Sequence, residues 1–149
     1  MQTLLYALLA ILMGAMMSVY LPMNSVVARY LGSPLTASIA FYVVGLLTSL
    51  VILGLFGDLK TILKFRNVPP YLFLTGVMSA MLVLGMIVLV PKFGARKVFI
   101  LLLAGQVIMA IIVSHLGILE SPKDPINLRK LVGAALLVIG VVVSMAGNT

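Results

Sequence analysis

The chain has 149 residues, of which 63% are hydrophobic and only 9% are charged, and its formal net charge is +7 at pH 7. Soluble globular domains carry charged residues at about a quarter of their positions, so this composition excludes an ordinary soluble fold. Most lysines and arginines stand near the ends of apolar stretches, where they meet lipid headgroups, and this argues against nucleic acid as a partner.

Five apolar runs dominate the sequence, and each is about long enough to cross a bilayer. A hydrocarbon core about 30 Å thick requires roughly 20 apolar residues in a helix. The runs lack the period-two alternation of membrane β-strands, and helices are the other way to satisfy backbone groups in lipid. We therefore predict an all-α polytopic membrane protein, a five-transmembrane-helix bundle that forms a single transmembrane domain over residues 1–149. The predicted helices span approximately residues 3–30, 34–55, 70–90, 95–119 and 128–146.

Prolines and small polar residues set several features of the first two helices. The first helix contains Pro22, which removes one backbone hydrogen bond, bends the helix and frees a carbonyl near Ser18. Ser33 and Pro34 are typical of a cap followed by a first-turn proline, and they predict the start of the second helix. The first run has no basic region before it and continues well past the length of a signal peptide, so we expect it to be retained as a span.

The positive charges are almost balanced between the two sides of the membrane. Five spans place the termini on opposite sides, with six cations on the N-terminal side and four on the other. The six are Lys60, Lys64, Arg66, Lys123, Arg129 and Lys130, and the four are Arg29, Lys92, Arg96 and Lys97. This distribution predicts only a weak preference for a cytoplasmic N-terminus, and it is what insertion in both orientations would give. A single orientation, enforced by a partner or by the first helix, is the alternative.

Small residues recur at helical spacing and predict packing seams. Ala10, Gly14 and Ser18 follow one another every four residues, Gly76 and Ala80 do the same, and Gly133, Gly140 and Gly147 recur every seven. In lipid, close backbone approach at small residues supplies the contact between helices. We expect most of these seams to pack inside the chain, and the fifth helix to be a candidate dimer face.

Polar residues at membrane depth are the candidate functional residues, because a polar group in lipid is either satisfied structurally or acts on a solute. Four helices each carry a small and polar face, and together these faces could enclose a wet cavity. They comprise Tyr20 and Asn24; Ser38, Tyr42, Gly45 and Ser49; Thr75 and Ser79; and Gln106, Ala110 and Ser114. The alternative is that Asn24 and Gln106 only tie helices together, and that the hydroxyls bond to a carbonyl one turn back.

Missing residue types exclude several functions. Asp58, Glu120 and Asp124 all lie in predicted loops, so no span offers the carboxylate with which proton-driven cation transporters usually exchange a proton for substrate. No glycine-rich phosphate-binding loop with its lysine is present, and one histidine without any cysteine cannot build a zinc site. We therefore expect no enzyme activity, no metal site and no cofactor, and we expect His115 to lie at the membrane interface.

Several segments, in order along nearly the whole chain, carry a family resemblance. The most specific block runs from Leu21-Pro22-Met23-Asn24-Ser25 through Ala28-Arg29-Tyr30-Leu31-Gly32-Ser33-Pro34 to Ala37-Ser38. Further segments are Val90-Pro91-Lys92-Phe93-Gly94-Ala95, Gly105-Gln106, and Arg129-Lys130 before Gly133 and Gly140. In these residues the chain resembles YdcZ-like proteins, a branch of the drug/metabolite transporter superfamily.

The resemblance implies an architecture beyond the single chain. Members are five-helix proteins of the bacterial inner membrane, about half the size of ten-helix relatives that consist of two inverted halves. One such half is expected to pair with an antiparallel second half to complete the transport path. The small multidrug-resistance branch of the superfamily uses a glutamate in its first helix, which this chain lacks, so proton-driven export of organic cations by that route is not expected.

The leading hypothesis is a membrane transporter module of the drug/metabolite transporter type, which moves a small solute by alternating access, with export as the expected direction. It would work as an antiparallel homodimer or with a paralogous five-helix partner, and a neutral, zwitterionic or anionic solute suits its polar groups. The alternatives are a non-transporting scaffold or accessory subunit, and a passive pore or lipid-moving protein. The predicted substrate contacts are Asn24, Gln106, Tyr20 and Tyr42, and the predicted pathway or gating residues are Pro22, Arg29, Ser38 and Ser79.

Overall fold

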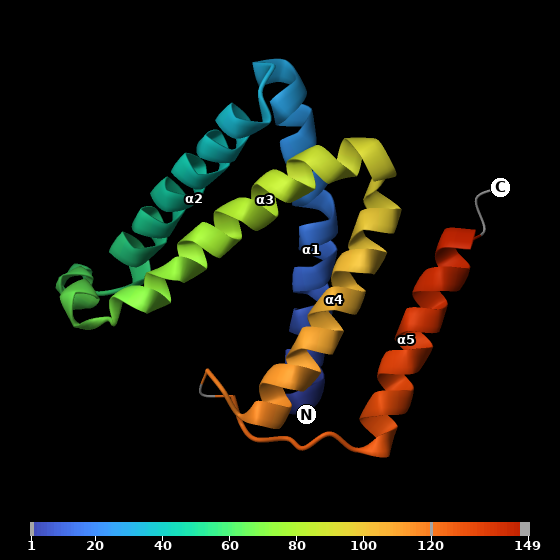
Figure 1. The fold of residues 1–149 in the computed structure, drawn as a ribbon. Coiled ribbons are helices and arrows are strands. Elements are labelled where there is room, and N and C mark those ends of the chain that lie inside the picture. Colours follow the sequence, from blue (N-terminus) through green and yellow to red (C-terminus); the bar gives the residue numbers. More distant parts are fainter. Residues whose placement is uncertain (1, 120, 147–149) are drawn as a thin grey trace. The chain divides into compact units, whose positions relative to one another are not determined.

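The computed structural model describes residues 2–119 and 121–146, and it is helical over most of that length (Figure 1). Five helical segments of the described residues are long and apolar enough to cross a membrane, so the predicted all-α, five-span architecture is confirmed. Glu120, expected in a loop, and Gly147, expected in the seam of the fifth helix, lie outside the described residues. In chain order the elements are α1 (Gln2–Leu31), α2 (Pro34–Phe56), η1 (Leu59–Asn67), η2 (Pro70–Phe73), α3 (Leu74–Phe93), α4 (Ala95–Leu116) and α5 (Leu128–Ala146).

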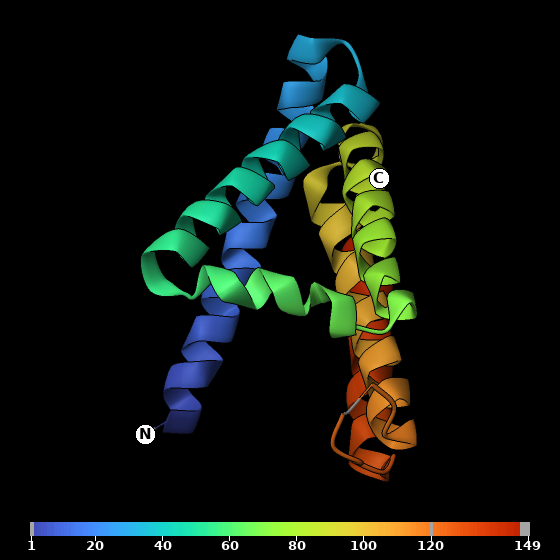
Figure 2. The same ribbon diagram turned by 90° about the vertical axis from the view of Figure 1, so that its left-hand side faces the viewer.

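The turn between α1 and α2 forms as the sequence predicts. Gly32 takes a positive φ of +68°, which glycine adopts without steric penalty. The side chain of Ser33 accepts a hydrogen bond from the N–H of Thr36 at 3.3 Å, and Pro34 occupies the first turn of α2. Both views show α1 and α2 diverging from this turn (Figures 1 and 2).

The third span begins at Pro70 as predicted, but it ends at Phe93 instead of residue 90. It opens with the 3₁₀ turn η2, because Pro70 holds Pro69 in an extended conformation, and the α-helix begins at Leu74. The helix α3 then continues through Pro91 to Phe93. Pro91 removes one hydrogen bond close to the C-terminal end, where little helix remains to be disturbed.

The fourth helix is shorter than predicted, ending at Leu116 instead of residue 119. Gly117 adopts a left-handed conformation with φ +62°, and its N–H donates to the carbonyl of Val113 at 3.0 Å. A glycine in this conformation is a common helix end.

The charged connection after α2 differs from a plain loop. It forms η1, and the carboxylate of Asp58 caps the first turn of η1 by accepting a hydrogen bond from the N–H of Lys60 at 2.9 Å.

The chain divides into two compact units, Met1–Lys92 and Phe93–Thr149. The single transmembrane domain over the whole chain stays a prediction. The first unit contains α1, α2 and most of α3, and a cluster of buried apolar side chains joins these three helices. Its buried members are Ala28, Ala37, Val83 and Ile87, and Phe41 and Tyr42 pack against them.

The second unit is a helical hairpin in which α4 and α5 lie side by side (Figures 1 and 2). The Nη1 atom of Arg96 donates to the carbonyl oxygen of Ser144 at 3.1 Å and to the Oγ atom of Ser144 at 2.9 Å. These hydrogen bonds join the beginning of α4 to the end of α5, so the two helices run antiparallel.

The small-residue seams do not pack inside the units as expected. A Cβ atom placed on Gly14 or Gly76 meets no heavy atom within 4 Å, so neither glycine allows a close helix contact within the first unit. The buried face of α1 lies further along the helix, from Leu21 to Ala28, and this explains why Gly14 stays open. Gly133 and Gly140 of α5 are equally open, and their role as a dimer face stays a prediction.

Candidate functional site

The buried face of α1 combines apolar and polar side chains. Leu21, Asn24, Ser25 and Ala28 are buried, and their spacing of three, one and three residues places them on one side of the helix. Asn24 is 9% exposed and Ser25 is 6% exposed. The face that α1 turns toward its neighbours therefore carries an amide and a hydroxyl at membrane depth.

Two atoms on this face have no hydrogen-bond partner among the described residues: Nδ2 of Asn24 and Oγ of Ser25. A buried polar atom without a partner costs about 1–3 kcal/mol of stability. Most serine and threonine hydroxyls in helices avoid this cost by bonding to a carbonyl one turn back, as Ser18 does to Gly14 at 3.1 Å. Asn24 and Ser25 are thus donors that the first unit itself leaves unused.

Aromatic and hydroxyl groups connect α1, α2 and α3 beside these atoms. The rings of Tyr20 and Phe41 are stacked, with centroids 5.8 Å apart and an interplanar angle of 10°. Phe41 meets Tyr42 edge to face at 5.1 Å, and the hydroxyl of Tyr42 lies 2.7 Å from the hydroxyl of Ser79.

A groove of about 340 Å³ lies between α1 and α2 at the position of Asn24. The α2 side of this groove includes Phe41 and Gly45, and a Cβ placed on Gly45 meets nothing within 4 Å. The groove is otherwise lined by aliphatic side chains. We call it the Asn24 groove, since Asn24 is the polar side chain in its lining.

Some of the predicted site residues of the first unit contact one another, and others lie apart from these contacts. Pro22 lies inside α1 directly after Leu21, at the start of the buried face, and Ser38 is buried in the first turns of α2. Tyr20, Tyr42 and Ser79 belong to one chain of ring and hydroxyl contacts through Phe41. Arg29 is exposed in the last turn of α1, away from this chain of contacts.

Gln106 is the predicted site residue that belongs to the second unit. It is exposed on α4. The hypothesis that Gln106 and Asn24 line one cavity stays a prediction, as do the binding and gating roles of all eight predicted residues.

Sequence reasoning missed Phe41 and Ser25. Phe41 stands among apolar residues, so its own type did not mark it. Its position directly before Tyr42, a tyrosine of the polar face, could have indicated an aromatic contact there. Ser25 follows Asn24 directly and lies four residues after Leu21, on the same helix face. A serine next to the asparagine was visible in the sequence, but only its burial without a partner marks it as unusual.

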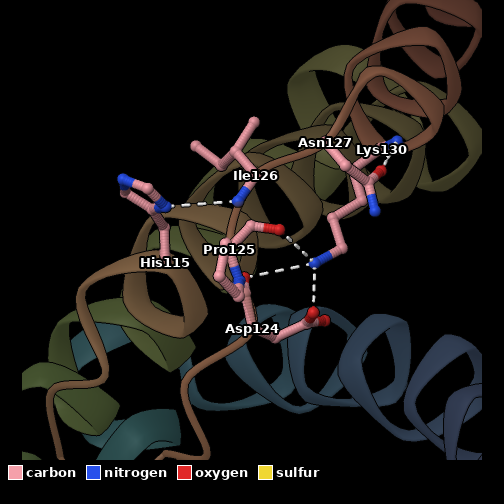
Figure 3. Close-up of polar contacts among 6 residues, drawn as sticks. All are labelled: His115, Asp124, Pro125, Ile126, Asn127 and Lys130. Carbon is pink, nitrogen blue, oxygen red and sulfur yellow. Dashed lines mark hydrogen bonds and ion pairs between the residues drawn. The ribbon is translucent and has the colours of Figure 1, made fainter.

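Figure 3 shows a second group of polar contacts, in the connection between α4 and α5. The Nζ atom of Lys130 donates to the carbonyls of Asp124 at 3.1 Å and Pro125 at 2.7 Å, and it forms an ion pair with the Asp124 carboxylate. The N–H of Ile126 donates to Nδ1 of His115 at 3.2 Å. These contacts fix an irregular segment against the end of α4, so we assign them a structural role.

The sequence matches the family described as "Putative inner membrane exporter, YdcZ" over residues 5–143. The match covers nearly the whole chain, so the protein belongs to this family, and the resemblance found in the sequence is confirmed. It is a multi-pass protein of the inner membrane, and the family description indicates a transporter rather than an enzyme. No curated protein and no solved structure matches the chain.

Proposed function

We propose that this protein is a transport module that exports a small solute by alternating access, and that two copies in opposite orientations form the working unit. The observation that carries the proposal is the buried amide of Asn24, whose Nδ2 atom has no partner among the described residues. In a lipid-embedded helix such a donor is costly, and polar residues within spans commonly mark solute pathways. A bound solute or its hydration water would supply the missing acceptor.

The chemistry of the Asn24 groove favours a neutral, zwitterionic or anionic solute. The unused group is an N–H donor, which suits a carbonyl or carboxylate oxygen. Phe41 adds flat apolar surface to the lining of the groove, and the rings of Tyr20 and Tyr42 pack against Phe41. None of the three acidic residues of the sequence falls within α1 to α5, so an organic cation would find no carboxylate partner in a span.

The pairing of two inverted copies rests on three observations. Family members are described as putative exporters, yet the chain has five candidate spans, half the number of the ten-helix relatives that the family resemblance implies. Its cations are nearly balanced between the two membrane sides. Gly45 leaves the Asn24 groove open on α2, where a helix of a second copy could approach closely.

Pro22 is the proposed pivot for the movement of α1. It lies inside the helix, between Tyr20 and Asn24, and it cannot donate a hydrogen bond to the carbonyl of Ser18. A helix with one missing backbone bond bends at that point with little resistance, so the half that carries Asn24 can move relative to the N-terminal half.

Flux measurements on purified protein in liposomes test the proposal. A panel of radiolabelled neutral, zwitterionic and anionic metabolites would identify a solute whose flux saturates. Asn24→Ala and Gln106→Ala should each reduce that flux by at least about tenfold, as expected when a hydrogen bond to the solute is lost. The matched control is Thr48→Ala on α2, because Thr48 is exposed and its hydroxyl is already satisfied by the carbonyl of Val44 at 2.8 Å.

The other functions give different results in the same experiment. Saturable flux that neither substitution changes would contradict the proposed contacts, and flux that never saturates would indicate a passive pore. Transfer of labelled phospholipid between leaflets, without flux of solutes, would indicate a lipid-moving protein. No flux and no lipid transfer in any condition would favour a scaffold or accessory subunit.

The inverted arrangement has a separate test. A reporter fused after Thr149 should be found on both sides of the membrane when the chain is expressed alone. A single fixed orientation in that experiment would rule out a homodimer of inverted copies and would leave a paralogous partner as the route to an antiparallel pair.

A further inference from the structure

A second groove in the first unit, with a volume of about 370 Å³, has a different character from the Asn24 groove. We call it the Ser25 groove. Its lining brings together the end of α1, the start of α2 and the end of α3, and most of the remaining surface is aliphatic. The residues that matter for its chemistry are Ser25 and Arg29 from α1, Gly32 and Pro34 from the turn and first turn of α2, and Pro91 and Lys92 from α3.

Three sources of positive potential meet at this groove. Arg29 and Lys92 contribute the two full charges, since each lies in the last turn of its helix and lines the groove. The third source is the N-terminal end of α2, which begins at Pro34 and carries the positive end of the helix dipole. An arrangement of helix N-terminus, guanidinium and ammonium is suited to an anion.

No acidic side chain balances these charges within the first unit. Asp58 is the one acidic residue in the sequence from 1 to 92, and it lies just beyond the far end of α2. The 23 residues of α2 extend about 34 Å at 1.5 Å per residue, which is several Debye lengths at physiological salt. Asp58 is also engaged as the cap of η1.

Ser25 provides the independent observation that a ligand belongs in the groove. It lines the groove, it is 6% exposed, and its Oγ atom has no hydrogen-bond partner among the described residues. The cations alone could be explained by their favourable position at the C-terminal ends of α1 and α3. That explanation gives no reason for a buried hydroxyl that forgoes the usual bond to a carbonyl one turn back.

We propose that the Ser25 groove binds an oxyanion, namely a carboxylate or phosphate group carried on a small apolar body. Arg29 and Lys92 bind the anionic group, the hydroxyl of Ser25 donates to one of its oxygens, and the aliphatic lining accommodates the body. The site does not depend on transport. The oxyanion could belong to a soluble metabolite or to a membrane phospholipid, and the chemistry of recognition is the same.

Equilibrium dialysis of the purified full chain in neutral detergent tests the site. The probes are radiolabelled octanoate and octyl phosphate, with octyltrimethylammonium as the cation of equal chain length. The wild-type chain should bind both anions at least about tenfold more tightly than the cation, the equivalent of one charge-assisted hydrogen bond. Equal affinity for the three probes would overturn the proposal, because binding would then be purely apolar.

Substitutions locate the binding. Arg29→Gln and Lys92→Gln should each weaken octanoate binding by about tenfold or more, and Ser25→Ala should weaken it by about three- to tenfold. Ser25→Ala removes a hydroxyl that has no hydrogen-bond partner among the described residues, so we expect the variant to fold like the wild type. The matched control is Lys64→Gln in η1, a cation of the first unit that lies outside the groove. Affinity that falls with Lys64→Gln as much as with Arg29→Gln would show a nonspecific charge effect and overturn the site.

A second arm distinguishes the two sources of the oxyanion. Protein reconstituted in nanodiscs that mix phosphatidylglycerol and phosphatidylcholine is washed with detergent, and the retained lipid is counted by native mass spectrometry. Phosphatidylglycerol that stays on the wild type and is lost with Arg29→Gln assigns the groove to a lipid headgroup. Octanoate binding that persists in pure phosphatidylcholine and needs Arg29 assigns it to a soluble anion. Neither result requires flux, so the site and the transport proposal can fail separately.

Discussion

The hydroxyl groups of Tyr42 on α2 and Ser79 on α3 lie 2.7 Å apart, although the two residues are 37 positions apart in the chain. This contact joins two helices through a polar bond at membrane depth, and the Tyr42 ring packs edge to face with Phe41, which stacks on Tyr20 of α1. A row of side chains thus crosses all three helices of the first unit. The side chains of this row are partners of one another. In contrast, Nδ2 of Asn24 and Oγ of Ser25 have no hydrogen-bond partner among the described residues.

Tyr42→Phe should lower the free energy of unfolding by about 0.5–1.5 kcal/mol, because the hydroxyl pair is lost while the ring contact with Phe41 remains. Ser79→Ala should have a similar effect. The double variant should cost clearly less than the sum of the two, since both substitutions remove the same bond. Unfolding in mixed micelles measures all three. Additive effects would show that the bond does not contribute.

Asn24→Leu should separate stability from transport. The amide has an unused donor, so its replacement by an apolar side chain of similar size should leave the free energy of unfolding unchanged or raise it by about 1–2 kcal/mol. Saturable flux should fall at the same time by at least about tenfold. The matched control is Thr48→Ala on α2, because Thr48 is exposed and does not line the Asn24 groove. Strong destabilisation by Asn24→Leu would mean that Asn24 has a structural partner.

Gly45→Leu should fill the Asn24 groove without disturbing the fold of the first unit. A Cβ at this position meets no atom within 4 Å, and replacing a glycine inside a helix gains up to about 1 kcal/mol of helix propensity. We expect unchanged or higher thermal stability together with loss of flux or of pairing, measured by liposome assay and by cross-linking. Gly54→Leu on the same helix is the control, because Gly54 is equally open but does not line the groove. Identical behaviour of the two variants would argue against a special role for the groove.

Ser144→Ala should loosen the hairpin of α4 and α5. The substitution removes the hydroxyl acceptor of Arg96 and leaves the carbonyl acceptor in place, so the expected loss is at the low end of about 0.5–1.5 kcal/mol. Hydrogen exchange of the last turn of α5 should become faster, whereas exchange in α1 and α2 should not change. Protection of α5 that stays at the wild-type level would contradict a stabilising role for this contact.

Lys130→Met should release the connection between α4 and α5. Lys130 is the donor to two carbonyls and the ion-pair partner of Asp124, and no second cation is bonded there among the described residues. Backbone exchange at Ile126 should accelerate by about tenfold, since the bond from its N–H to His115 depends on the same ordered segment. Arg129→Met, one residue earlier, is the control. Global stability should change by no more than about 1 kcal/mol, as is usual for exposed ion pairs.

The five spans were predictable because length and apolarity alone select helices in lipid. Their boundaries followed the sequence closely where a specific residue acts locally, as Ser33 and Pro34 do at α2. The misjudged ends depend on backbone detail, namely the left-handed Gly117 and the tolerance of α3 for Pro91 near its end. These choices are decided by one or two dihedral angles, which residue type restricts but does not fix.

The site was predictable in its residue types but not in its contacts. The periodicity of α1 and α2 selected Asn24, Tyr20, Ser38 and Tyr42 as polar faces, and the structure buries two of them and links the tyrosines through Phe41. Which donors would remain without a partner depends on the packing of three helices, so Ser25 could not be distinguished from an ordinary back-bonded serine. Gly14 and Gly76 make no close contact within the first unit, because packing there uses another stretch of α1, and the expectation that they pack elsewhere in the chain stays a prediction.

Asn24 and Ser25 are consecutive residues on α1, so their side chains leave the helix about 100° apart and reach different grooves. Both donors lie in the part of α1 that follows Pro22, so a rotation of this part moves them together. We therefore expect the two grooves to be coupled: binding in one groove should change the affinity of the other through the orientation of this stretch of helix.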